Sequence, residues 1–554
     1  MNSTRRPGAL GATLCLQALL AVAAPSASAR ADSRDSLEPL PQAQWDRAAA
    51  AHLLRRAAFG ATPQEIDKLA AMRLEDAVDY LVDYDEIPFQ MPPAAVHESL
   101  RRPVERFRMR GLSEEDRRAA AQERRQLERR AFEETRLWWI ERMATTPRPF
   151  EEVMTLFWHG HFTSGMREVR NAVFMQEQDE FLRRHALDSF RELLLGVSKD
   201  RAMLVYLDGA RNTKKAPNEN YARELMELFT LGVGAYSETD VKEAARAFTG
   251  WDYDARGFVF RGREHDFDEK RFLGKRGSFD GADVIDIILE QPACSRFLAR
   301  KLLEFFVRPD PEKTLVEALA SELRRRDYEL RPVLKKLLAS RAFFHPSAHG
   351  SMIKSPAQLV VGAARTFGVS IENLPGAERA LRAMGQELMQ PPNVKGWDGG
   401  PAWINTATLF YRYNTLGGLV FGAADRGRGP RGAALGNDEE SQAGALASAG
   451  VEAASMTSMS AAPLAPRSRM GDREQAKLDP MMLVRDNGLA TAEQIVDYFC
   501  EHLLAAPLPQ AKRELLIAYL LNNAKRLDLE RPSAADRIRM TIHLICSTPE
   551  YQLL

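Results

Sequence analysis

Segments in which apolar and polar residues alternate, as they do in half-buried β-strands, are almost absent from this sequence. Ala, Leu, Arg and Glu dominate its 554 residues, and these residues favour helices. Helices are expected at 48–56, from Thr62, where Thr62 and Glu65 form a capping box, and over Ser113–Met143. The sequence therefore predicts an all-α fold built from many helices.

One segment departs from this pattern. Phe258–Phe260 and Arg271–Leu273 are short runs with aromatic residues, and we expect them to pair as a single small β-hairpin. From 425 to 477 the composition shifts to Gly, Ala, Ser, Arg and Pro, with few large apolar residues. Such a segment buries too little apolar surface to offset its ordering entropy, which predicts a disordered insertion. We expect one main domain over 48–424, completed by the helical segment 478–554.

The N-terminus has the parts of a secretory signal. Arg5 and Arg6 precede an apolar run over 9–24, and Ala27-Ser28-Ala29 matches a small-residue cleavage site. The run is short for a membrane span, so we expect residues 1–29 to be removed and 30–47 to be a polar spacer. The sequence thus predicts an exported protein, periplasmic or extracellular, without a transmembrane segment after cleavage; a retained N-terminal anchor is the alternative.

Charge and cysteine content narrow the function classes. Lys plus Arg and Asp plus Glu both number 76, so no positive excess is available for a phosphate backbone, and we expect no nucleic-acid partner. After cleavage Cys294, Cys500 and Cys546 remain, far apart and without a zinc-binding spacing. We expect three buried thiols, with a Cys500–Cys546 disulfide as the alternative.

The first candidate site lies in the helical segment 218–232. Asn220, Glu224 and Glu227 share one face at positions i, i+4 and i+7, which would present two carboxylates and an amide to a metal ion or a substrate. The structural alternative is a surface ladder in which Arg223 pairs with Glu219 and Glu227.

The second candidate is the segment FWHGHF at 157–162. His159 and His161 flank a glycine, so they suit a helix end at which both imidazoles could converge on one metal ion. The alternative is a pair of buried structural histidines.

The third candidate, His265-Asp266-Phe267-Asp268-Glu269-Lys270, is a polar loop before the second expected strand. His265 and Asp266 could form an acid–base unit or complete a metal shell. They could equally belong to a turn held by aspartate side chains.

The fourth candidate is the loop 391–405, which contains Lys395, Trp397 and Trp403 among prolines and glycines. If the two indoles are exposed, they form a platform for a sugar ring or an apolar polymer. If they are buried, they attach the loop to the neighbouring helices.

Several common enzyme classes lack their motifs here. The sequence contains no Gly-x-Ser-x-Gly, no His-Glu-x-x-His, no phosphate-binding Gly-x-x-x-x-Gly-Lys-Ser/Thr and no Gly-x-Gly-x-x-Gly. Serine hydrolases of the nucleophile-elbow type, zincins, P-loop enzymes and dinucleotide oxidoreductases therefore lose most of their support.

Eight segments, taken in order, resemble the bacterial domain of unknown function 1800 family. They are HLLRRAAFGATPQEI at 52–66, FWHGHF at 157–162, PNENYARELMELFTLGVG at 217–234, AARAFTGW at 244–251, HDFDEKRFLG at 265–274, IKSPAQLVVGAART at 353–366, PPNVKGWDGG at 391–400 and STPEYQ at 547–552. Asp268 stands where the family commonly has glycine. The resemblance implies export, and it implies a partner from the exported domain of unknown function 1501 family. It supplies no activity.

Three functions follow as hypotheses. The first is an exported, metal-assisted enzyme that acts on an extracellular polymer or envelope component. Its divalent metal ion would be held by His159, His161 and His265; Glu224, Glu227 and Asp266 would be catalytic, and Asn220, Arg223, Lys395, Trp397 and Trp403 would bind substrate. The second is a non-catalytic envelope or secretion partner. The third is a glycan-binding module.

Overall fold

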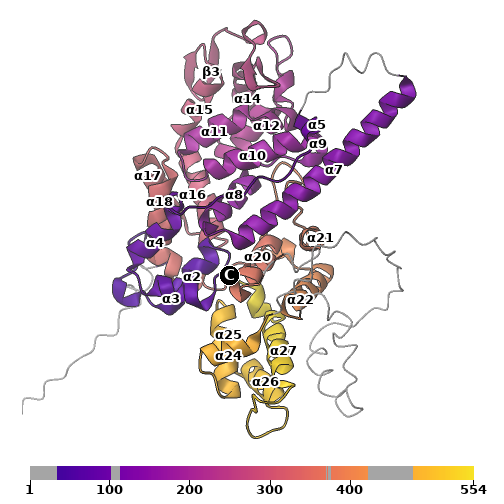
Figure 1. The fold of residues 1–554 in the computed structure, drawn as a ribbon. Coiled ribbons are helices and arrows are strands. Elements are labelled where there is room, and N and C mark those ends of the chain that lie inside the picture. Colours follow the sequence, from indigo (N-terminus) through magenta and orange to yellow (C-terminus); the bar gives the residue numbers. More distant parts are fainter. Residues whose placement is uncertain (1–33, 102–112, 370, 372–375, 422–477) are drawn as a thin grey trace, which may run out of the picture.

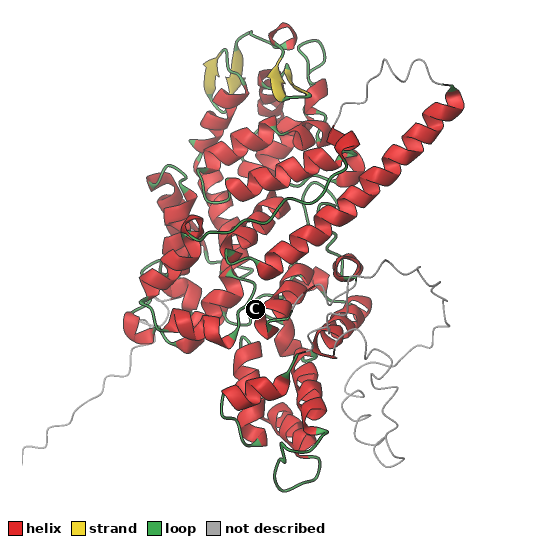
Figure 2. Cartoon of the chain, in the orientation of Figure 1, coloured by secondary structure: helices red, strands yellow, loops and turns green. Residues whose placement is uncertain are grey.

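The computed structural model describes residues 34–101, 113–369, 371, 376–421 and 478–554. The expected signal at 1–29 and the expected insertion at 425–477 lie outside these residues. Throughout the described part the chain is helical apart from two small antiparallel sheets, so the all-α expectation is confirmed. Figure 2 shows both sheets at one end of an elongated molecule.

The N-terminal half begins with short helices and continues into one long helix. Their bounds are α2 Arg47–Ala57, α3 Pro63–Ala70, α4 Leu74–Val82, α5 Glu98–Arg101, α7 Glu114–Thr145, α8 Pro149–His161, α9 Met166–Val169, α10 Ala172–Arg184, α11 Phe190–Lys199, α12 Arg201–Tyr206, α13 Asn220–Glu224 and α14 Glu238–Ala247. The capping box expected at Thr62 and Glu65 is present at the start of α3.

The C-terminal half consists of helices that fold back along the first half and end in a separate bundle, yellow in Figure 1. Their bounds are α15 Gly281–Leu289, α16 Pro292–Phe306, α17 Lys313–Arg325, α18 Leu330–Leu338, α19 Arg341–Phe344, α20 Pro356–Phe367, α21 Ala377–Ala383, α22 Thr406–Phe421, α24 Pro480–Asp486, α25 Ala492–Leu503, α26 Gln510–Leu521 and α27 Ala534–Cys546. Helix α27 packs on α22, which connects the bundle to the rest of the molecule.

The long helix α7 projects from the body at one end and enters it at the other (Figure 1). Ser113 caps its first turn by accepting the main-chain N–H of Asp116, as the sequence predicted for a helix opening at Ser113. Its exposed first half carries Arg and Glu. Its second half buries Trp139, Ile140 and Met143 against α8 and α10.

The strands form two hairpins instead of one. β1 Trp251–Asp254 pairs with β2 Gly257–Phe260, and β3 Lys270–Phe272 pairs with β4 Lys275–Gly277. The expected pairing of 258–260 with 271–273 is therefore wrong, although both segments contribute strands. Each strand pairs with its neighbour across a two-residue turn; at the second turn Leu273 and Gly274 both have positive φ, 45° and 85°, which suits a tight hairpin.

Buried apolar side chains form one continuous cluster that runs from Leu37 to Tyr551. Cys294, Cys500 and Cys546 are free thiols, and the first and last are buried, so the alternative disulfide is not formed. Among the described helices, none combines the length and apolar character needed to cross a bilayer.

Candidate functional site

The segment 218–232 is not a regular α-helix. Asn218 begins it, since its side-chain oxygen accepts the main-chain N–H of Asn220. Helix α13 ends at Glu224, and Leu225–Thr230 continues as a π-helical turn, within which the Thr230 hydroxyl donates to the carbonyl of Leu225. Because a π-turn is wider than an α-turn, it shifts the residues after Glu224 out of the register that the sequence predicts, and such turns are frequent at functional sites.

Arg223 forms ion pairs with Glu219 and Glu238, which do not belong to the expected stripe. Its guanidinium lies 2.8 Å from Glu238 and 3.1 Å from Glu219. The Arg223–Glu219 half of the predicted ladder is thus present, whereas the Arg223–Glu227 half is not formed. Glu227 instead accepts a hydrogen bond of 3.1 Å from the Tyr236 hydroxyl.

Glu224 and Glu227 form a half-buried carboxylate pair. Burial and the negative charge of Glu227 raise the pKa of Glu224 above its usual 4.5, and Arg223 opposes this only in part. The carboxyl group of Glu224 makes no hydrogen bond to any other residue that the structure describes. Burial and the charges of Glu168 and Glu224 raise the pKa of the neighbouring Tyr206 to about 12. The pair is therefore bordered by two phenols, one of which is already bonded to Glu227.

Asn220 lies apart from the shifted part of this segment. It is exposed in the first turn of α13, ahead of the π-turn. Its main-chain N–H is used by Asn218, and its side chain stays available to solvent. Of the predicted stripe, Glu224 and Glu227 therefore remain together as a functional candidate, and the Asn220 side chain lies at its edge.

His159 and His161 lie in the last turn of α8, at the helix end that the sequence predicted, but each faces a different part of the core. The Nε2 of His159 accepts the main-chain N–H of Met389 at 3.0 Å, and the ring packs between Trp139 and Trp397. The Nε2 of His161 donates to the carbonyl of Phe229 at 3.0 Å. Burial lowers the pKa of His159 to about 4 and that of His161 to about 3. Both are neutral, buried groups that connect chain segments.

The loop 391–405 is attached to the end of α8. The carbonyl of Val394 accepts the Thr163 hydroxyl, and Gly396 approaches so closely that a Cβ there would lie 2.6 Å from the carbonyl oxygen of Gly160. Trp397 is half-buried against His159, and Trp403 is only 6% exposed. The indoles thus adopt the buried alternative and attach the loop to the helices.

Lys395 is exposed at the tip of this loop. Its ammonium forms an exposed ion pair of 2.8 Å with Asp398, three residues further along the chain. It makes no contact with the carboxylate pair in the structure. Of the predicted substrate-binding residues of this loop, Lys395 is therefore the one that solvent reaches freely.

The third candidate loop is held by its own side chains. The Nδ1 of His265 donates to the carbonyl of Thr249 at 2.8 Å, and Asp266 forms an ion pair of 2.7 Å with Arg246. The Arg246 guanidinium lowers the pKa of Asp266. The buried Lys270 ammonium donates to the carbonyls of Asp266 and Asp268. These contacts match the structural alternative for the loop, in which the Asp266 carboxylate accepts from Arg246 and from the main-chain N–H of Asp268.

The structure does not bring the three histidines to one point. Within the described ranges, no group of three or more His, Cys, Asp or Glu side chains is placed to hold a metal ion. The residues present do not fit the divalent ion of the first hypothesis, and no step can be assigned to one here.

A buried ionic network near α8 escapes sequence reasoning. Glu152 is fully buried and accepts from the indole of Trp139 at 2.8 Å and from Arg183 at 2.7 Å, and Arg142 also contacts it. Arg183 in turn pairs with Asp179 at 2.8 Å. Because Arg142 belongs to a helix whose first half is rich in Arg and Glu, the sequence alone suggests that its side chain faces solvent. The nearby tryptophans are the only signal in the sequence of a buried environment.

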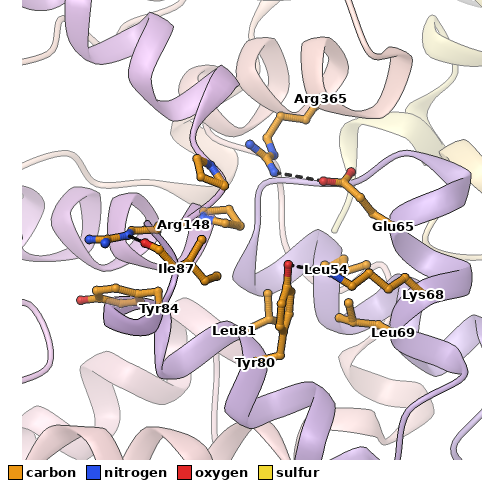
Figure 3. Close-up of a pocket in the computed structure, with 12 residues that line it drawn as sticks. Leu54, Glu65, Lys68, Leu69, Tyr80, Leu81, Tyr84, Ile87, Arg148 and Arg365 are labelled. Carbon is orange, nitrogen blue, oxygen red and sulfur yellow. Dashed lines mark hydrogen bonds and ion pairs between the residues drawn. The ribbon is translucent and has the colours of Figure 1, made fainter. Parts of the chain in front are cut away.

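A cavity of about 120 Å³ also lies outside the predicted sites, between α3, α4 and the start of α8 (Figure 3). Its polar side chains are occupied by one another: Lys68 donates to Tyr80 at 2.9 Å, Arg148 to the carbonyl of Ile87, and Arg365 lies 3.6 Å from Glu65. The charged groups that line the cavity are therefore already paired or hydrogen-bonded.

A model for the family described as "Protein of unknown function (DUF1800)" matches residues 52–553. Neither the search of the curated proteins nor that of the solved structures finds a match.

Proposed function

The chain belongs to the DUF1800 family, whose description states no activity, and we propose that it is an exported protein in which Glu224 and Glu227 perform acid–base chemistry on an extracellular polymer or envelope component. One observation carries this proposal. Among the acids chosen from the motifs, these two adjoin each other, lie half-buried and are not neutralised by a bidentate cation.

The two acids differ in their surroundings. Among the described residues the carboxyl group of Glu224 has no hydrogen-bond donor, and burial together with Glu227 raises its pKa. Glu227 accepts a hydrogen bond from the hydroxyl of Tyr236. The raised pKa of Glu224 suits it to donate a proton, and the carboxyl group beside it can serve as the base. Glu224 is the acid and Glu227 the base in this proposal.

The accessibility of the pair favours a large substrate. Both acids are partly exposed on the helix surface, and the two phenols beside them offer apolar faces with polar tips. An extended polymer can lie across such a surface, whereas a small molecule needs to be enclosed. Export is supported by the residues at 1–29, and it is tested by fractionating cells and measuring whether the mature mass corresponds to cleavage after Ala29.

The enzymatic proposal is tested with purified protein and a panel of cell-wall polysaccharides and envelope peptides, with products followed by mass spectrometry. Glu224→Gln should lower turnover at least about a hundredfold, the size typical of losing a general acid. Glu219→Gln is the matched control, because it lies on the same segment but pairs with Arg223. Turnover by the wild type that Glu224→Gln leaves unchanged would refute the assignment.

A second candidate is a non-catalytic role with the exported domain of unknown function 1501 partner. It is favoured by the exposed aromatic rings beside His265: Phe267 is 64% and Phe260 48% exposed. Stoichiometric co-purification of that partner, lost on Phe267→Ser and retained in Glu224→Gln, would favour this role over catalysis.

A further inference from the structure

Three family segments that are far apart in sequence meet beside the C-terminal bundle. The main-chain N–H of Lys354 donates to the carbonyl of Gln552 at 2.8 Å, and the N–H of Leu554 donates to the carbonyl of Met352 at 2.7 Å. From the N-terminal segment, Arg56 reaches the main-chain oxygen of Leu554 at 3.1 Å. Residues of 52–66, 353–366 and 547–552 also line one common cavity, together with Leu554.

This region contains four cations: Arg55, Arg56, Lys354 and Arg412. Arg55 donates to the carbonyl of Glu501 at 3.0 Å, and Arg412 to the carbonyl of Lys354 at 2.8 Å. Arg56 likewise contacts carbonyl oxygens, and no described Asp or Glu side chain forms an ion pair with any of the four. Because buried charges are normally paired, this concentration of positive charge calls for a compensating anion.

Lys354 is the least satisfied of these cations. It is only 7% exposed, its Nζ lies 3.7 Å from the centroid of the Tyr551 ring, and its ammonium makes no hydrogen bond with a described acceptor. Lys354, Arg55, His502 and Tyr551 line a cavity of about 20 Å³. That volume is close to the space that one water-sized particle needs.

We propose that this cavity, the Lys354 cavity, binds one small monovalent inorganic anion between the Lys354 ammonium and the Arg55 guanidinium. The cavity is too small for a polyatomic organic acid, and among the described residues no Asp or Glu side chain competes for the N–H donors around it, although Leu554 also lines it. The anion would join the three family segments in the native state.

The charge of Lys354 makes this binding depend on pH. Burial, with the positive charges of Arg55 and Arg412, lowers the pKa of Lys354 to about 7. Around it, burial raises the pKa of Cys546 to about 12 and raises that of Tyr551, and it lowers the pKa of His502 to about 4. These three groups therefore keep their charge state between pH 6 and 8.5, while Lys354 loses its proton and with it the attraction for an anion.

The test measures thermal unfolding of the full chain in sodium chloride against sodium gluconate at equal ionic strength. Chloride should raise the Tm of the wild type by about 1 °C or more at pH 6, and by less at pH 8.5. Lys354→Met should abolish the difference between the salts, and Lys395→Met, an exposed control, should keep it.

Equal responses to the two salts would overturn the proposal. That result is expected if a carboxyl group at Leu554 already neutralises the cavity. An unchanged chloride effect in Lys354→Met would also overturn it. If Lys354→Met does not fold, wild-type crystals soaked in bromide decide: an anomalous scattering peak beside Lys354 supports the site, and its absence from the cavity rejects it.

Discussion

The Nε2 of His159 accepts the main-chain N–H of Met389 at 3.0 Å across 230 residues of sequence. This bond attaches the loop that carries Trp397 to the end of α8. It uses the lone pair that a metal ion would need, so the histidine holds two family segments together.

Replacing His159 with Leu should therefore destabilise the fold. The N–H of Met389 would be left buried and unbonded, which costs about 1–3 kcal/mol. Urea unfolding measures the loss. His185→Leu, at a partly exposed histidine that pairs with Asp188, should change stability by less than about 1 kcal/mol. Equal effects of the two variants would contradict this role for His159.

The buried histidines predict a steep loss of stability in acid. His161 has a pKa of about 3 in the native state, against 6.5 in the unfolded chain, so the unfolded state binds more protons between these values. Its contribution is complete above pH 6.5 and falls as the pH drops toward 3, by about 1.4 kcal/mol per pH unit. Denaturant unfolding of wild type and His161→Gln, which keeps a donor for Phe229, should show a shallower pH dependence for the variant; an unchanged slope would refute this.

The ionic network around Glu152 should be intolerant of neutralisation. Glu152→Gln leaves Arg142 and Arg183 with too little negative charge in a buried site, and the expected loss is about 3–5 kcal/mol. Glu114→Gln removes an exposed partner of Arg118 on α7 and should cost at most about 1 kcal/mol. Chemical denaturation compares the two, and a small effect of Glu152→Gln would show that the network is not stabilising.

Two glycines with similar backbone angles separate strain from contact. Gly396 and Gly234 have φ of 88° and 87°, so alanine is strained at both. Only at Gly396 would the new Cβ meet a backbone oxygen, that of Gly160, whereas nothing lies within 4 Å at Gly234. Gly396→Ala should lower the Tm more than Gly234→Ala does. It should also change the fluorescence of Trp397 more than Gly234→Ala does. Equal Tm values would mean that the loop is not seated on α8.

Much of the local structure could be predicted from the sequence. Ser113 and Thr62 mark helix starts because capping depends on a few adjacent residues. The prediction of strand pairing was wrong because the short runs at 258–260 and 271–273 contain no information on which strand each will pair with. The π-turn was missed as well, since a helical stripe looks the same whether or not the register shifts after Glu224.

The candidate sites show the same division. The sequence located Glu224, Glu227 and the histidines, but a histidine next to a carboxylate in a motif does not reveal whether a backbone group will take its ring nitrogen. His159, His161 and His265 are all bonded to main-chain groups that lie far along the chain or across a turn. The buried network of Glu152 joins three helices, and the tryptophans of α7 indicate burial without showing which charges meet there.

In the proposed function Glu224 and Glu227 act as an electrostatically coupled pair. Carbon-13 NMR of carboxyl-labelled glutamates, with the Glu224 signal identified by its loss in Glu224→Gln, measures this directly. Glu224 should titrate above 4.5 in the wild type and at a lower pH in Glu227→Gln, where the like charge is removed. Titration of Glu224 at or below 4.5 in both proteins would contradict it.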